Sequence, residues 1–202
     1  MKLYYSPGAC SLSPHITALE AGINLELVKV DTKTKTLADG SDFRAINPKG
    51  QVPTLMLDDG EIVTEGPVIA QILADLAPAS NLAPGNGTKA RYKLQEWLNF
   101  ITSELHKGYT PLFKPTTPED YKPLAKAHLT ERYAFVDQKL AGKQYLLGDQ
   151  FTVADAYLFT VSSWAKHVGV DLAGFANVGA YMDRIAQRPK VQQALKAEGL
   201  VK

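Results

Sequence analysis

The sequence predicts a small mixed α/β domain followed by an all-helical domain. Three observations carry this prediction. Strand and helix signals alternate over the first eighty residues, residues 78–87 (PASNLAPGNG) are rich in turn formers, and only helical periodicity follows to the end. We therefore expect one domain over residues 1–80, a linker over 81–87 and a helical domain over 88–202.

The chain opens with a strand–helix–strand pattern. Residues 2–5 (KLYY) have the composition of a strand. Ser13 as N-cap and Pro14 at the first helical position predict the start of a helix, and Gly22 is a natural stop. Residues 24–30 (NLELVKV) alternate as a second strand. Because a helix connects the two strands, we expect them to be parallel.

A strand–strand–helix pattern completes the first domain. The polar stretch 31–46 contains a turn and leaves room for a short helix. An apolar strand over 52–57 and a second strand over 61–64 flank the Asp-Gly pair at 59–60, which predicts an antiparallel hairpin. A helix over 66–76 follows, with Gly-Pro at its start. Together, these elements describe a mixed sheet with helices packed on it.

The rest of the chain is predicted to be helical. The expected helices cover 88–112, 119–140, 152–168, 177–186 and 191–197. Thr152 and Asp155 have the spacing of a capping box, in which each side chain accepts from the backbone N–H of the other residue. We expect this pair to stabilise the helix at the centre of the second domain.

Composition and charge bound the partners and the compartment. Hydrophobic residues make up 45% of the 202 residues, and 22 Lys and Arg balance 21 Asp and Glu. This balance predicts no nucleic-acid partner. No apolar stretch approaches the roughly 18 residues of a membrane span, and the N-terminus lacks a signal-peptide pattern. We therefore expect a cytoplasmic protein without a membrane partner.

Cys10 is the only cysteine, and it lies where the first strand gives way to a helix. A single cysteine cannot form an internal disulfide or hold a structural zinc. The scattered histidines give no metal motif, so we expect no metal site. Two interpretations of Cys10 remain. It is either a small buried apolar residue or a reactive sulfur whose thiolate the helix start favours.

Two short motifs in the first domain have both a structural and a binding interpretation. Pro53 is either a plain edge-strand proline or part of a cis Val52–Pro53 bond that presents the Val52 backbone to a peptide-like ligand. Glu65 and Gly66 either cap a helix or grip the ammonium and carboxylate groups of an amino-acid head group.

A third candidate motif lies on the first long helix. Asn99, Ser103 and His106 stand at i, i+4 and i+7 and so share one face. A polar stripe on an otherwise apolar helix suits a ligand cleft, but it also suits a solvated face.

Taken together, these motifs resemble those of the cytosolic glutathione S-transferases. The resemblance rests on a thioredoxin-like βαβ–ββα half, Val-Pro before the third strand, Glu-Gly at the next helix start and Thr-Val-Ala-Asp in a helical half. Pro-Gly-Ala-Cys-Ser around Cys10, Asn-Pro-Lys-Gly-Gln-Val-Pro over 47–53 and Glu-Leu-His-Lys over 104–107 resemble the bacterial beta class in particular. The resemblance covers the whole chain and implies the glutathione transferase fold.

The resemblance also implies a set of site residues. The matching glutathione-binding positions are Cys10, Lys35, Val52, Pro53, Glu65, Gly66, Asn99, Ser103, Glu104, Leu105 and His106. Of these, Cys10 and His106 are the implied catalytic residues, near the glutathione sulfur. Many members carry serine where this chain has Gly66, and loss of that hydroxyl predicts weaker binding of the γ-glutamyl carboxylate.

The implied reaction joins reduced glutathione, a co-substrate rather than a resident cofactor, to a small hydrophobic electrophile. We expect helical side chains such as Phe113, Trp164 and His167 to build the electrophile pocket. The resemblance also implies a homodimer. Two alternatives stay open: thiol–disulfide exchange through Cys10, and a non-enzymatic ligand carrier on the same fold.

Overall fold

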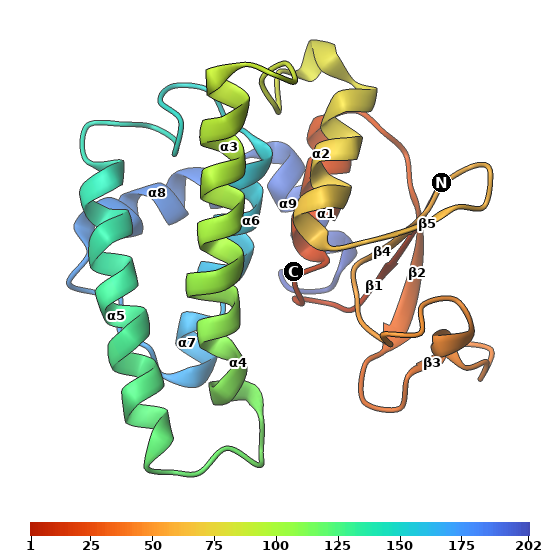
Figure 1. Ribbon diagram of the computed structural model, residues 1–202, viewed down its shortest axis with the longest axis horizontal. Coiled ribbons are helices and arrows are strands. Elements are labelled where there is room, and N and C mark those ends of the chain that lie inside the picture. The colour runs from red at the N-terminus through yellow and green to blue at the C-terminus, as the bar shows by residue number, and fades with distance from the viewer. The chain divides into compact units, whose positions relative to one another are not determined.

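The computed structural model describes all of residues 1–202, and by their contacts they form two compact units (Figure 1). The first unit combines Met1–Ala83 with Gln187–Lys202, and the second covers Pro84–Ala186. The final segment therefore packs with the N-terminal unit, although the sequence pattern groups it with the other helices. The reason is that α9 (Pro189–Ala197) packs against α1 (Leu12–Glu20).

A five-stranded mixed sheet, in the order β3-β2-β1-β4-β5, forms the centre of the first unit. The strands are β1 (Lys2–Tyr5), β2 (Glu26–Asp31), β3 (Thr36–Leu37), β4 (Thr54–Met56) and β5 (Ile62–Thr64). As predicted, β1 pairs in parallel with β2, and β4 and β5 form an antiparallel hairpin. The two-residue β3 was not predicted, because so short a strand leaves no readable alternation.

Helices α1 and α2 (Gly66–Leu76) pack together beside the sheet (Figure 1). The predicted start of α2 is confirmed, with Pro67 at its second position. The prediction of Ser13 as N-cap of α1 is wrong: the helix begins at Leu12, and Ser11 is its N-cap. Pro14 is nevertheless tolerated, because the N–H groups of the first helical turn have no intrahelical partner. Two short 3₁₀ turns complete the unit, at Phe43–Ala45 and Pro78–Ser80.

Apolar side chains fill the space between the sheet and its helices. One buried cluster joins Leu55 of β4 to Ala18 of α1 and to Ile69 and Leu73 of α2. This packing fixes the start of α2 against the loop that precedes β4, and that loop carries several predicted site residues.

The second unit is helical throughout. Its helices are α3 (Lys89–Phe100), a π-helical turn (Ile101–His106), α4 (Lys107–Phe113), α5 (Tyr121–Leu140), α6 (Val153–Ser162), α7 (Ala165–Val168) and α8 (Ala176–Ala186). The single helix expected over 88–112 is thus interrupted by the π turn, although α3 and α4 follow one another along one rod (Figure 1). None of the helices combines the length and the apolar character needed to cross a bilayer.

Helix α6 is completely buried, and it packs against α3 and α8. Its predicted capping box is confirmed. The Asp155 carboxylate accepts hydrogen bonds from the N–H and hydroxyl of Thr152, at 2.8 and 2.9 Å, and from the N–H of Leu146 at 2.9 Å. The Tyr181 hydroxyl donates a fourth bond, at 3.0 Å. Asp155 therefore connects α6 to the loop before it and to α8.

Candidate functional site

Cys10 lies in the turn between β1 and α1. The turn is closed by a hydrogen bond of 3.0 Å from the Leu12 N–H to the Ala9 carbonyl. The thiol is only partly buried, and its Sγ donates to the Val52 carbonyl at 3.2 Å. This exposure argues against the interpretation of Cys10 as a plain core residue, and it places the sulfur beside the Val-Pro motif.

A tightly bonded loop over 47–53 carries Val52 and Pro53. The buried Asn47 side chain donates to the Gln51 carbonyl at 2.9 Å and to the Thr54 hydroxyl at 2.8 Å. The Val52–Pro53 peptide bond is cis, as one of the two interpretations of this motif requires. Gly66 faces the same proline, since a Cβ at this glycine would lie 3.4 Å from Pro53 Cγ.

Glu65 has an unusual backbone at the start of α2. Its φ of 70° and ψ of 107° lie in a region that residues other than glycine seldom occupy. Its carboxylate lies 2.7 Å from Lys49 Nζ, which also donates to the Thr64 hydroxyl at 3.0 Å. Both partners of this ion pair are exposed, so it adds little to stability. A strained residue held at a helix start is typical of a binding site.

Lys35 reaches the same loop from the segment after β2. Its φ of 63° is again in the left-handed region, and the Phe43 N–H donates to its carbonyl at 2.8 Å. Its side chain passes close to Gly50, because a Cβ there would lie 3.3 Å from Lys35 Cδ. Six of the predicted site residues therefore lie around loop 47–53: Cys10, Lys35, Val52, Pro53, Glu65 and Gly66.

The loop before Cys10 rests on the C-terminal segment. The side chain of Glu198 is completely buried, and it accepts a hydrogen bond of 2.9 Å from the Gly8 N–H. Its other oxygen lies 2.9 Å from Nδ1 of the buried His15. Burial, and then the Glu198 carboxylate, raise the pKa of Tyr5, which disfavours its phenolate. Glu198 therefore holds the backbone two residues from the thiol.

The second unit carries the other predicted residues on or beside the π turn. Asn99 and Ser103 are exposed, Leu105 is completely buried, and His106 is half-buried. π turns are frequent at functional sites, because the extra residue changes the direction of the side chains that follow. Nδ1 of His106 lies 2.7 Å from the hydroxyl of Tyr157, a residue that the sequence analysis did not identify.

Glu104 lies among three side chains of its own unit. Its carboxylate lies 3.1 Å from Arg132 Nε and 3.8 Å from His128 Nε2, and it accepts from the Ser103 hydroxyl at 3.2 Å. Arg132 comes from α5, so this ion pair fixes the π turn against the neighbouring helix.

Aromatic rings surround His106. The Trp164 ring makes edge-on contacts with His106, Tyr109 and Phe113, at centroid distances of 5.0, 5.8 and 5.8 Å. Phe113 and Trp164, two of the three residues expected to build an electrophile pocket, thus lie together with the histidine. We call His106, Tyr109, Phe113, Tyr157 and Trp164 the His106 cluster.

Sequence reasoning missed Lys49, Tyr157 and Glu198. The Asn-Pro-Lys-Gly run over 47–50, which ends two positions before Val52, is a local signal that could have identified Lys49. Glu198 has no such signal, because its partner Gly8 lies 190 residues away in the chain.

Comparison with known protein families matches both halves of the chain. The family model described as "Glutathione S-transferase, N-terminal domain" matches residues 8–76, and the one described as "Glutathione S-transferase, C-terminal domain" matches residues 100–189. Among curated proteins, the chain is 52% identical over 200 residues to "Glutathione S-transferase GstA" of Escherichia coli O157:H7. This match covers 99% of the chain and 100% of that protein.

Solved structures give the same result. A beta-class glutathione S-transferase of Sphingomonas chungbukensis superposes with a TM-score of 0.96 at 47% identity. A sphingomonad glutathione S-transferase solved in complex with glutathione gives a TM-score of 0.95, also at 47% identity. Both matches cover 100% of this chain and of the compared chain.

Proposed function

The chain belongs to the glutathione S-transferase family and to its bacterial beta class, and we propose that it conjugates reduced glutathione to small hydrophobic electrophiles. The observation that supports this most directly is the gathering of six predicted residues around loop 47–53. They come from four separate stretches of sequence, and they combine a thiol, a peptide edge, a helix start and a carboxylate. A tripeptide with charged ends needs this combination of groups.

In the proposed complex, glutathione lies extended along loop 47–53. The Val52 carbonyl, which accepts from Cys10 in the free protein, accepts from the cysteinyl N–H in the complex, and the Cys10 S–H turns to the glutathione sulfur. The Gly66 N–H, at the first position of α2, donates to the γ-glutamyl carboxylate. The Glu65 carboxylate receives the ammonium group. Lys35 and Lys49 add positive charge beside the peptide.

The chemical step begins with the glutathione thiol, which is mostly protonated at neutral pH. Hydrogen bonds from Cys10 and His106, together with the N–H groups at the start of α1, favour its thiolate. The thiolate attacks the electrophilic carbon, a carbon–sulfur bond forms, and a leaving group such as chloride departs. The thiol proton passes to solvent.

We assign the remaining positions to the second unit. Asn99, Ser103, Glu104, Leu105 and His106 complete the proposed glutathione site. The His106 cluster supplies the apolar surface for the electrophile, because Phe113, which contacts Trp164, is half-exposed and can contact a bound molecule.

We also propose a homodimer and a cytoplasmic location. The single cysteine fits a reducing compartment.

Calorimetric titration with reduced glutathione tests the binding step, and product formation with 1-chloro-2,4-dinitrobenzene tests the chemistry. Glu65→Gln removes the charge that receives the ammonium group, so we expect affinity to fall by about tenfold. Glu61→Gln, an exposed carboxylate on the neighbouring hairpin, is the matched control. Absence of heat with millimolar glutathione in the folded wild-type protein would overturn the proposal. Disulfide reduction without conjugation would overturn its chemical step.

A further inference from the structure

A cavity opens on the first unit where α1 and α9 meet the chain that leads into β2. Its volume is about 180 Å³. Aliphatic side chains form most of its wall, and they are Ala18, Leu19, Ile23, Leu25, Leu27 and Ala197. His15, Asn24 and Gln193 complete the lining, and we call the hollow the His15 cavity. None of these residues belongs to the proposed glutathione site or to the His106 cluster, so the proposed reaction leaves the cavity unused.

His15 is the buried polar group of this wall, with only 4% of the residue exposed. Its Nδ1 lies 2.9 Å from a carboxylate oxygen of Glu198. Because a carboxylate only accepts hydrogen bonds, Nδ1 carries the proton, and in the neutral ring Nε2 is left as an acceptor. Nε2 has no hydrogen-bond partner in the protein, yet it is not sealed inside the core. The cavity that the ring lines therefore gives a ligand access to Nε2.

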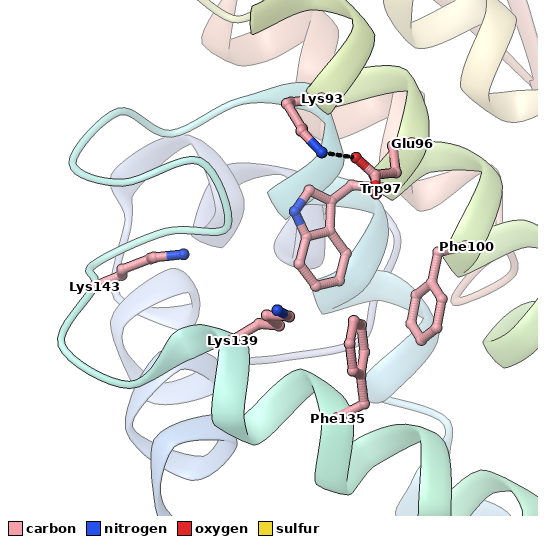
Figure 2. A pocket seen from close by; sticks show the side chains of 7 residues that line it. All are labelled: Lys93, Glu96, Trp97, Phe100, Phe135, Lys139 and Lys143. Carbon is pink, nitrogen blue, oxygen red and sulfur yellow. Dashed lines mark hydrogen bonds and ion pairs between the residues drawn. The ribbon is translucent and has the colours of Figure 1, made fainter.

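The charges around the His15 cavity favour a neutral ligand. Apart from His15, no side chain in its wall can carry a charge. In this it differs from the hollow between α3 and α5, where lysines and a glutamate surround aromatic rings (Figure 2). The charge behind the imidazole is that of the buried Glu198 carboxylate, which repels an anion. A ligand with a cationic group would have to leave water for an aliphatic wall, which is also unfavourable.

We propose that the His15 cavity binds a neutral phenol, a single aromatic ring whose hydroxyl donates to Nε2 of His15. A dry apolar cavity of about 150 Å³ holds one benzene molecule, so the volume suits one ring and its hydroxyl. The aliphatic wall would contact the ring, and the one convergent polar group would fix its orientation. A rigid ring loses little conformational freedom on binding, and this favours a phenol over a flexible alcohol.

A nitrogen–proton correlation spectrum of the histidine rings measures this binding. The variant His106→Gln/His128→Gln/His167→Gln keeps His15 as the only histidine and identifies its signals in the wild type. Titration with phenol should move the Nε2 signal in the direction that marks acceptance of a hydrogen bond. Toluene carries a methyl group in place of the hydroxyl and should leave the nitrogen signal where it is. Benzoate should bind at least about tenfold more weakly than phenol, because Glu198 repels it.

Two variants at the end of α9 test the location of the bound phenol. Ala197 lines the cavity, so Ala197→Leu fills part of the space and should weaken phenol binding by at least about tenfold. Lys196→Leu, at an exposed neighbouring position outside the cavity, is the matched control and should bind phenol as the wild type does. Both variants should keep the circular dichroism spectrum of the wild type.

A competition experiment separates this cavity from the proposed electrophile surface. Saturating S-hexylglutathione, whose hexyl chain would cover the His106 cluster, should not displace phenol from His15. The His15 titration does not depend on glutathione, so failure of the proposed function would leave its result unchanged.

Any of four outcomes would overturn the proposal. They are an unmoved His15 signal at millimolar phenol, the same nitrogen shift with toluene, wild-type affinity for phenol in Ala197→Leu, and displacement of phenol by S-hexylglutathione.

Discussion

Nδ1 of His106 lies 2.7 Å from the hydroxyl oxygen of Tyr157. Tyr157 lies in α6, the buried helix of the second unit, so its position is fixed by surrounding core packing. The tyrosine thereby orients the imidazole on the π turn and engages one of its two nitrogens. Within our proposal, Tyr157 is a positioning residue that acts through His106.

Replacing Tyr157 by phenylalanine tests this relationship. Loss of one hydrogen bond of about 1 kcal/mol predicts a decrease in kcat of about fivefold, with the KM for glutathione unchanged. Tyr92→Phe, an exposed position on α3, is the control. A normal kcat in Tyr157→Phe, or a rise in KM alone, would contradict the assignment.

Gly66→Ser should tighten glutathione binding. A serine hydroxyl at the first position of α2 adds a charge-assisted hydrogen bond to a carboxylate, which predicts a gain of about tenfold in affinity. The structure accommodates the new Cβ, since it would only touch Pro53 Cγ at 3.4 Å. Gly66→Ala adds the Cβ without the hydroxyl and should leave the dissociation constant unchanged. Equal affinities for Ser and Ala variants in calorimetry would refute the prediction.

Asp155→Ala should lower the free energy of unfolding by about 3 kcal/mol or more, because it leaves the buried donors of Thr152, Leu146 and Tyr181 without their acceptor. Urea denaturation measures this loss. Glutathione affinity per folded molecule should be retained, since Asp155 touches no predicted site residue. A matching loss of affinity in a fully folded sample would show that its role is not only structural.

The same carboxyl group gives stability a pH dependence. Burial raises the pKa of Asp155 from its ordinary value of 3.8 to about 6, despite the four donors that lower it. The folded state therefore binds a proton that the unfolded state releases, and this stabilisation is lost as pH rises through 6. The stability difference between wild type and Asp155→Ala should grow by about 1 kcal/mol from pH 7 to pH 5. Urea titrations at both pH values would reveal a constant difference if the pKa were ordinary.

Glu198→Ala should both destabilise the protein and weaken glutathione binding. It removes the acceptor of the Gly8 N–H and the partner of His15, at a cost of about 2–4 kcal/mol. Because Gly8 lies two residues before Cys10, its release should also raise the KM for glutathione. Glu198→Gln keeps one acceptor oxygen, so its stability and its KM for glutathione should lie between those of the wild type and the alanine variant. Unaltered denaturation and kinetics in the alanine variant would show that the contact is dispensable.

The sequence predicted the fold well because its local signals agree. The alternation of residues 24–30, the Asp-Gly turn at 59–60 and the Gly-Pro start at 66 each point to one element, and the structure has all three. The predicted start of a helix was wrong where two residues offer the same capping signal. Ser11 and Ser13 are equally suitable caps, and only tertiary packing decides between them.

The π turn at Ile101–His106 shows why part of the site could not be predicted. A π turn adds one residue to a helix, but apolar residues recur at helical spacing both before and after it. The pattern over 88–112 therefore still predicts a single helix. The contacts of Glu198 and Tyr157 are long-range pairings, and a single sequence contains no information about them. The motifs indicated Cys10 and His106 as candidates, but they gave no indication of Glu198 beneath the loop before Cys10 or of Tyr157 beside His106.

The first unit is completed only by residues that are translated after the whole helical unit. Its sheet and helices α1 and α2 are encoded before residue 84, yet α9, which packs against α1, and the carboxylate beneath Gly8 come from Gln187–Lys202. During synthesis, the sheet of the first unit lacks α9 and Glu198 until the entire helical unit has been translated. A premature stop codon after Ala186 would therefore damage the beginning of the protein rather than its end.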